Sequence, residues 1–260
     1  MIRRTWVLLV AVLVGLNVVM GQKQMKPYTE WTDKEAEKIL NNSAWGRTQT
    51  ETDTSEMFFR PDGQNAATPN SSVDRQLNGA TNQATGINYR VRFLSARPVR
   101  EAFARRVELQ QKAANPNLVA QLKKFVEGGF ADYIVVVVDF DTKDARYANL
   151  PRQAFAAAVP ATLKSTTYLD RNDGKRLFLI DYRPPAADGM GAKFIFPRTF
   201  EGKPFLSSDF TQVRFYSELL RVGATGDLAG LNKSATGSKQ IKIDVRFKVA
   251  DMNYNGQLEY

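Results

Sequence analysis

The C-terminal region of the chain carries an unbroken two-residue hydrophobic alternation, a pattern that a half-buried β-strand satisfies. From position 241 to position 249, apolar residues occupy every odd position and charged residues every even one. Successive side chains of a strand point to opposite faces of a sheet, so one face of this strand packs in a core and the other meets water. The fold must therefore supply a sheet with one buried and one solvated face.

Several other segments predict strands. The run 133–140 is apolar around four consecutive valines, which is typical of a strand buried on both faces. Asn172-Asp173-Gly174 predicts a hairpin turn between strands at 166–169 and 176–182, because Asn and Gly tolerate positive φ. Further strands are expected at 87–93, 193–196 and 213–219. Antiparallel strands at this spacing predict a β-sandwich.

A helix near the N-terminus is predicted by its capping residues. Thr32 and Glu35 have the spacing of a capping box, and Gly46 is expected to end the helix. Trp31 and Trp45 bracket this segment. We expect both indoles to pin the helix to the main domain, and carbohydrate stacking or a partner surface is the alternative.

Two more helices are expected after the strand at 87–93. Pro98 and Asn115-Pro116 mark their starts, and Gly128-Gly129 closes the pair. Both helices should expose cations, which indicates either a binding face or the solvated side of amphipathic helices. The cations are Arg97, Arg100, Arg105, Arg106, Lys112, Lys123 and Lys124.

The expected fold class is α+β, a mostly antiparallel β-sandwich with an N-terminal docking helix and a two-helix insertion. The expected organisation is a signal peptide at 1–21, an N-terminal helical segment at 22–47, a polar flexible loop at 48–86 and a globular α+β domain with the antiparallel sandwich at 87–260. The segment 48–86 is polar and can bury little surface, apart from a strand expected at 50–59.

The first residues predict export. Arg3 and Arg4 precede an apolar stretch, and Val19-Met20-Gly21 places small residues before a cut at Gln22. An uncleaved membrane anchor is the alternative, but an apolar run of about 15 residues is shorter than the ~20 that span a bilayer. We therefore expect a secreted or periplasmic protein with no integral membrane span after signal cleavage.

The chain contains neither histidine nor cysteine. This excludes Ser-His-Asp triads, cysteine nucleophiles and Cys/His zinc sites, because each needs an imidazole or a thiolate. No cofactor is expected. The formal net charge of +9 favours an anionic partner, or reflects a solvated surface rich in Lys and Arg.

Three motifs have a chemical interpretation and a structural one. Asp139-Phe140-Asp141-Thr142 is similar to the start of haloacid dehalogenase-type phosphatases, but its Thr is one position early, so we interpret it as a strand end. The segment 251–256 matches the opening of an EF-hand loop. No helix pair surrounds that segment, and Asn255-Gly256 indicates a hairpin turn instead. The glycine-rich stretch 223–237 lacks the context of a phosphate-binding loop.

Two segments behind the export signal resemble a known group of proteins. These are Trp-Thr-Asp-Lys-Glu-Ala at 31–36 and Ser-Ala-Trp at 43–45. They resemble uncharacterised exported proteins of environmental bacteria, a family of unknown function, and the similarity extends to 167–169 and 194–198. The resemblance implies export and shared architecture, and it carries no activity, ligand or site residue.

The leading functional hypothesis is an exported non-enzymatic binding or structural module of the cell envelope or extracellular space. Its expected anionic-ligand face consists of Arg90, Arg92, Lys242, Arg246 and Lys248, which would form one cationic patch if their strands are neighbours. The expected partner is an anionic envelope polymer or another envelope protein. Nucleic acid is not expected, because the aromatic residues of the strand at 87–93 lie on its core side.

The alternative is a carboxylate-dependent enzyme acting on polysaccharide. Paired acids can serve as general acid and as nucleophile or base without histidine. The candidates are Asp139, Asp141, Asp144 and Asp181. This hypothesis requires two of their carboxyl groups to share a cleft.

Overall fold

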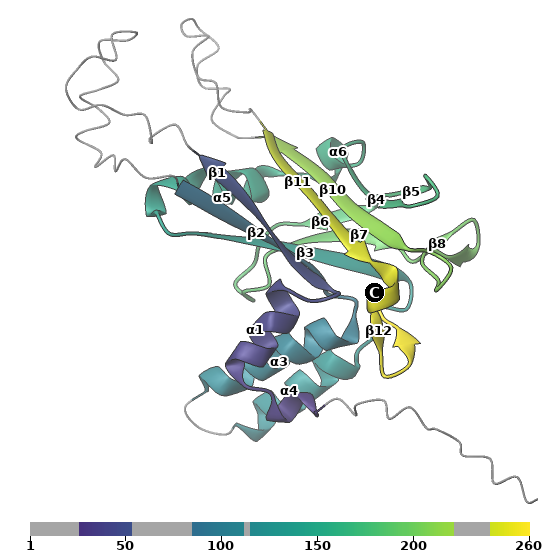
Figure 1. The fold of residues 1–260 in the computed structure, drawn as a ribbon. Coiled ribbons are helices and arrows are strands. Elements are labelled where there is room, and N and C mark those ends of the chain that lie inside the picture. The colour runs from purple at the N-terminus through teal and green to yellow at the C-terminus, as the bar shows by residue number, and fades with distance from the viewer. Residues whose placement is uncertain (1–25, 54–84, 112–114, 221–239) are drawn as a thin grey trace, which may run out of the picture.

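The computed structural model describes residues 26–53, 85–111, 115–220 and 240–260. Within these ranges two antiparallel sheets pack face to face, and helices α1, α3 and α4 gather on one side of them (Figure 1). The expected α+β fold is therefore confirmed. The predicted signal peptide, most of the predicted polar loop, Lys112 and the glycine-rich stretch lie outside the described residues.

The strands form two main sheets. Sheet A has the order β1-β2-β3-β7-β6, and sheet B has the order β11-β10-β4-β5. The strands of sheet A are β1 (Gly46–Asp53), β2 (Thr85–Phe93), β3 (Tyr133–Thr142), β7 (Ala192–Pro197) and β6 (Asp181–Arg183). The strands of sheet B are β11 (Gln240–Lys248), β10 (Gln212–Leu220), β4 (Thr167–Arg171) and β5 (Arg176–Phe178). Two short hairpins are β8 (Thr199–Phe200) with β9 (Lys203–Pro204), and β12 (Asn253–Tyr254) with β13 (Gln257–Leu258).

The α-helices among the described residues lie before β1 and in two insertions. The α-helices are α1 (Asp33–Asn41), α3 (Arg97–Gln110), α4 (Pro116–Glu127), α5 (Asn149–Ala157) and α6 (Pro160–Leu163). The 3-10 turns are η1 (Tyr28–Glu30), η2 (Ala145–Tyr147) and η3 (Val249–Asp251). The sequence predicted the insertion of α3 and α4 between β2 and β3, and it missed α5 and α6 between β3 and β4.

Aromatic side chains from both sheets fill the space between them. Phe93 of β2 meets Phe247 of β11 with ring centroids 4.9 Å apart, and Phe194 of β7 meets Phe215 of β10 at 5.3 Å. All four rings are fully buried. Burying one such side chain contributes about 1.5–3 kcal/mol. The predicted sandwich is thus confirmed, and the central strand β3 is buried on both faces from position 134 to 138, as its valine run predicted.

The two sheets are connected at both of their long edges. On one side the chain passes from β5 to β6, and consecutive amides bond to opposite sheets: Leu179 N–H donates to Thr167 O, and Ile180 N–H donates to Ile195 O. On the other side the Gln49 amide of β1 bonds to the backbone of β11, at 2.8 Å to Lys242 O and 2.7 Å to the Asp244 amide. The sandwich is therefore closed at both edges.

The N-terminal helix is capped and anchored as predicted. The Glu35 amide donates to Thr32 Oγ1 at 3.2 Å, and the Thr32 amide donates to Glu35 Oε2 at 2.7 Å. Trp31 and Trp45 are both buried, and the Trp45 indole donates to Glu259 O at 2.8 Å. The indoles thus hold α1 to the domain, which confirms the structural interpretation of these residues.

Three details of the predicted N-terminal half are wrong. Helix α1 ends at Asn41, and Gly46 begins β1 instead of ending the helix. That strand begins at 46 and not at 50, so residues 48 and 49 of the expected loop are also strand, and positions 54–59 of the predicted strand lie outside the described residues. The basic face expected on α3 is largely absent, because Arg100 is buried and Arg105 and Arg106 form ion pairs.

Candidate functional site

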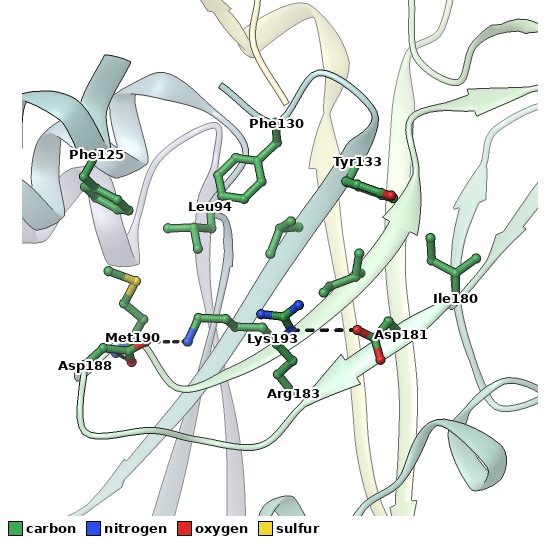
Figure 2. Close-up of a pocket in the computed structure, with 12 residues that line it drawn as sticks. Leu94, Phe125, Phe130, Tyr133, Ile180, Asp181, Arg183, Asp188, Met190 and Lys193 are labelled. Atoms are coloured by element: carbon green, nitrogen blue, oxygen red, sulfur yellow. Dashed lines mark hydrogen bonds and ion pairs between the residues drawn. The ribbon is translucent and has the colours of Figure 1, made fainter. Parts of the chain in front are cut away.

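A pocket of about 530 Å³ lies on the outer face of sheet A, beside α4 (Figure 2). Its floor is formed by Val135 of β3 and Ile195 of β7, which are direct partners in the strand register. This volume falls within the range of small-molecule sites in proteins. The lining residues are Leu94, Phe125, Phe130, Tyr133, Val135, Ile180, Asp181, Arg183, Asp188, Met190, Lys193 and Ile195.

Strand alternation explains why this face of sheet A is apolar. Val136 is the strand partner of Phe194, which packs on Phe215 of sheet B, so even-numbered residues of β3 point into the sandwich and Tyr133 and Val135 point outward. Tyr133 keeps 46% of its surface exposed, and Ile180 at the edge of the pocket keeps 43%. An apolar group of this kind on the surface is typical of a binding site.

Two arginines hold the wall of the pocket on the helix side. Arg100 of α3 is buried and donates to Val126 O at 3.2 Å and to Leu94 O at 3.3 Å. Arg198 donates to Phe130 O at 3.2 Å and to Tyr133 O at 3.3 Å. The two carbonyls that Arg100 bonds are buried and would be costly to leave unpaired. Burial also lowers the pKa of Arg100, but arginine keeps its charge in proteins.

The rim of the pocket carries two ion pairs of different strength. Lys193 Nζ lies 2.6 Å from Asp188 Oδ2, whereas Arg183 Nε lies 3.8 Å from Asp181 Oδ2. Burial of Asp188 opposes its ionisation, but hydrogen bonds from Lys193 and from the Met190 amide hold the pKa of this carboxyl below its usual value. The Asp188–Lys193 ion pair is therefore within hydrogen-bond distance, whereas the Arg183–Asp181 ion pair is too long for a hydrogen bond.

The predicted anionic-ligand face does not form one patch. Arg90 and Arg92 belong to sheet A, and Arg92 retains only 2% exposure beneath α1, where it donates to Leu40 O. Arg92 Nη1 lies 3.1 Å from Asp139 Oδ2, and Arg90 Nη2 lies 2.8 Å from Asp141 Oδ2. Both arginines thus belong to a structural ion-pair network and present no free charge to a ligand.

The other three predicted residues lie on a different surface, the outer face of sheet B. Lys242, Arg246 and Lys248 alternate with buried residues of β11 and are exposed. Within the described ranges, none of the three forms an ion pair with a carboxylate. Strand β1 separates β11 from β2 in the closed sandwich. The sequence could not show this separation, because it depends on which edges of the two sheets meet.

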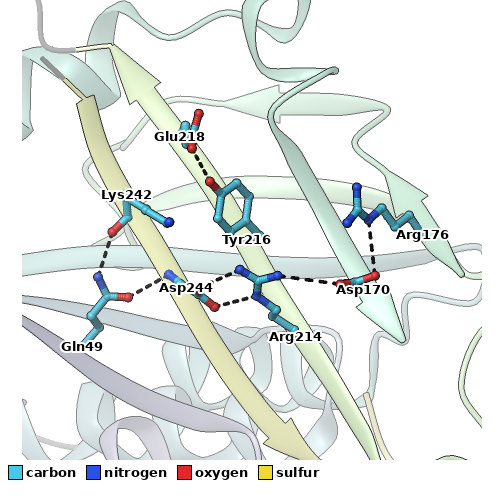
Figure 3. Close-up of polar contacts among 8 residues, drawn as sticks. All are labelled: Gln49, Asp170, Arg176, Arg214, Tyr216, Glu218, Lys242 and Asp244. Carbon is cyan, nitrogen blue, oxygen red and sulfur yellow. Dashed lines mark hydrogen bonds and ion pairs between the residues drawn. The ribbon is translucent and has the colours of Figure 1, made fainter. Parts of the chain in front are cut away.

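The acids on this outer face already have bonding partners (Figure 3). Arg214 makes two bonds to Asp244, at 2.6 and 2.7 Å, and lies 3.7 Å from Asp170. Tyr216 donates its hydroxyl to Glu218, and this hydrogen bond raises the pKa of Tyr216 to about 12. The carboxylates beside the three cations of β11 are therefore bonded to Arg214 and Tyr216 and not to these cations.

The acids proposed for an enzyme do not converge on the pocket. Asp181 lines the pocket, and its strand partner on β7 is Ile195. The partner of Ile195 on β3 is Val135, which lies four residues before Asp139. At about 3.4 Å per residue and ~4.8 Å per strand, the two aspartates are roughly 17 Å apart along the sheet. Glycosidase carboxyl groups are about 5–9.5 Å apart.

The remaining acidic candidates are also accounted for by the structure. Asp139 and Asp141 pair with Arg90 and Arg92. Asp144 lies in a turn, where its backbone amide donates to Thr142 Oγ1 at 3.3 Å. Among the described residues, no cluster of three or more acids could hold a metal ion. In the same part of the chain, no helix has the length and apolar character needed to cross a membrane.

Comparisons with protein-family models, curated proteins and solved structures found no match to this chain. The resemblance to exported bacterial proteins therefore stays a prediction. Any functional argument must come from the site itself.

Sequence reasoning missed most of the pocket. Of its lining residues, only Asp181 was a candidate, and it was chosen for catalysis. Phe125 and Val135 were assigned to a helix face and a buried strand, which is correct for each segment alone. The pocket arises where Phe125 of α4 and residues of β3, β6 and β7 meet around one space, and no local pattern in the sequence indicates that arrangement.

Proposed function

We propose that the protein is an exported, non-enzymatic binding module that holds an apolar ligand in the pocket on sheet A. The observation that carries this proposal is a pocket of about 530 Å³ with an apolar floor and an aromatic wall. The acids that line it, Asp181 and Asp188, are both ion-paired, which favours binding over carboxylate catalysis. Export rests on the predicted signal peptide.

The test uses N-phenyl-1-naphthylamine, an uncharged probe whose fluorescence rises in apolar sites. Titration of the full chain should give saturable binding at one site. Ile195→Trp should lower the affinity for the probe at least about tenfold, because the larger side chain occupies space at the pocket floor. Leu150→Trp is the matched control, since Leu150 is 42% exposed on α5 and does not line the pocket. Absence of saturable binding to the unmodified chain would refute the proposal.

A second candidate function is binding of an anionic envelope polymer along β11. It is favoured by the exposed row of Lys242, Arg246 and Lys248, which lies on one face of one strand. Binding of this kind weakens as salt screens the charges. Polyuronate binding should fall sharply when all three residues are changed to Glu. It should persist in a control with Lys34, Lys124 and Lys164 changed to Glu, and equal losses in both variants would refute a specific face.

A further inference from the structure

The charged groups that line the sheet-A pocket are balanced in number but unequal in how closely they are paired. Arg183 and Lys193 stand on its rim beside two lining acids, Asp181 and Asp188. Arg100 and Arg198 lie outside the lining and bond to the carbonyls of its wall. Asp132, on the turn that precedes β3, is exposed to solvent and lies outside the lining.

The two wall arginines make no close ion pair, and the charges of Glu259 and Glu101 act on Arg100 from a longer distance. Among the described residues, neither Arg100 nor Arg198 has an acidic partner within ion-pair distance. Arg100 is 4% exposed and lies 5.7 Å from the centre of the Phe130 ring, directly behind the aromatic wall. Both arginines therefore support the wall, and recognition of a ligand's charge falls to the side chains on the rim.

One cation on the rim is available to a ligand. The side chain of Arg183 is 70% exposed, and its only described partner, Asp181, lies at 3.8 Å. Asp181 has a second partner, because its Oδ1 accepts the Tyr182 amide at 2.8 Å. Most guanidinium donors of Arg183 are therefore free, and guanidinium groups bind carboxylates and sulfonates through two parallel hydrogen bonds.

We infer that the ligand of this pocket is a single anionic amphiphile, whose apolar body lies on Val135 and Ile195 and whose acidic head binds Arg183. This inference rests on the proposed function and adds the class of ligand to it. The occupant is a molecule dispersed in water, of the fatty-acid type, and not a lipid within a bilayer. The exposed and weakly paired guanidinium of Arg183 provides the charge complementarity, and the apolar floor receives the body.

Two probes that differ by one group test the inference. The anionic probe 8-anilinonaphthalene-1-sulfonate has the same ring system as N-phenyl-1-naphthylamine and adds only a sulfonate. The sulfonate should improve affinity about three- to tenfold, the size of one partly exposed ion pair. Arg183→Gln should remove this preference and leave the affinity for the neutral probe unchanged. Arg152→Gln, an exposed arginine on α5 outside the pocket, is the control.

The outcomes separate the inference from the proposed function. If neither probe binds, the proposed function fails. If both bind equally, or if Arg183→Gln leaves the preference intact, the pocket is a binding site but the anionic amphiphile is wrong. Decanoate below its micelle concentration should displace the anionic probe, and decanol should displace it less. Displacement by phosphatidylglycerol vesicles without displacement by decanoate would overturn the choice of a dispersed ligand.

Discussion

Removing one carboxylate charge beneath helix α1 should destabilise the whole domain. Arg92 is 2% exposed, and its nearest carboxylate is Asp139 at 3.1 Å, which also lies 3.7 Å from Arg90. Asp139→Asn keeps the size of the side chain and leaves a buried guanidinium without its counter-charge. Breaking one side of a buried ion pair costs about 3–5 kcal/mol. That is a large share of the ~5–15 kcal/mol that holds a typical domain folded.

Urea unfolding followed by tryptophan fluorescence measures this effect, because Trp31 and Trp45 are buried where α1 meets the domain. Asp139→Asn should strongly lower the urea concentration at the midpoint of unfolding, and it should change the dependence of the unfolding free energy on urea concentration little. Glu127→Gln is the control, because its pair with Lys123 is solvent-exposed at 3.9 Å and such pairs contribute about 0–1 kcal/mol.

A double variant tests the same reasoning if Asp139→Asn does not fold. Arg92→Met with Asp139→Leu removes both charges and should lose less stability than Asp139→Asn alone, since no charge is left buried. A loss below about 1 kcal/mol for Asp139→Asn would refute the account, because the guanidinium would then be neutralised by other groups.

Two further predictions concern packing and pH. Gly46→Ala should cost about 1–3 kcal/mol in urea unfolding, because the added Cβ would lie 2.2 Å from Leu40 O, whereas Gly129→Ala meets nothing within 4 Å. A loss of stability equal to that caused by Gly129→Ala would show that position 46 has room for a Cβ beside Leu40 O. Hydrogen bonds from Arg214 hold the pKa of Asp244 below its usual 3.8. The folding stability that ionised Asp244 contributes is therefore complete above pH 3.8 and is lost as the pH falls through the pKa of the folded state. The stability difference between the unmodified chain and Asp244→Asn should therefore shrink below pH 3.8, and a constant difference would contradict this assignment.

Much of the fold could be predicted from local patterns. The alternation at 241–249 and the turn at 172–174 depend on neighbouring residues alone, and both were confirmed, with Gly174 at φ 83°. The turn at Asn255 and Gly256 was confirmed in the same way, since both residues have positive φ. Period and turn chemistry are local, so one sequence is enough to identify them.

The candidate site could not be predicted, because its parts meet only through the tertiary fold. Arg90 and Arg92 alternate with core residues and were expected to face water. The outer face of their strand is instead covered by α1, which crosses so closely that only glycine fits at position 46. Similarly, Lys242 and Arg92 lie in different sheets, although each was assigned to the correct kind of strand.

The most direct test of the central claim is to map the bound probe by methyl NMR. Isoleucine and valine methyl groups of the full chain are labelled, and N-phenyl-1-naphthylamine is added in steps. The account predicts saturable shifts at Val135, Ile180 and Ile195, which line the pocket. Val159 should not move, although it is 48% exposed, because it lies outside the pocket. Shifts at Val159 equal to those at Ile195, or no shift at the three pocket residues, would show that this face of sheet A is not the binding site.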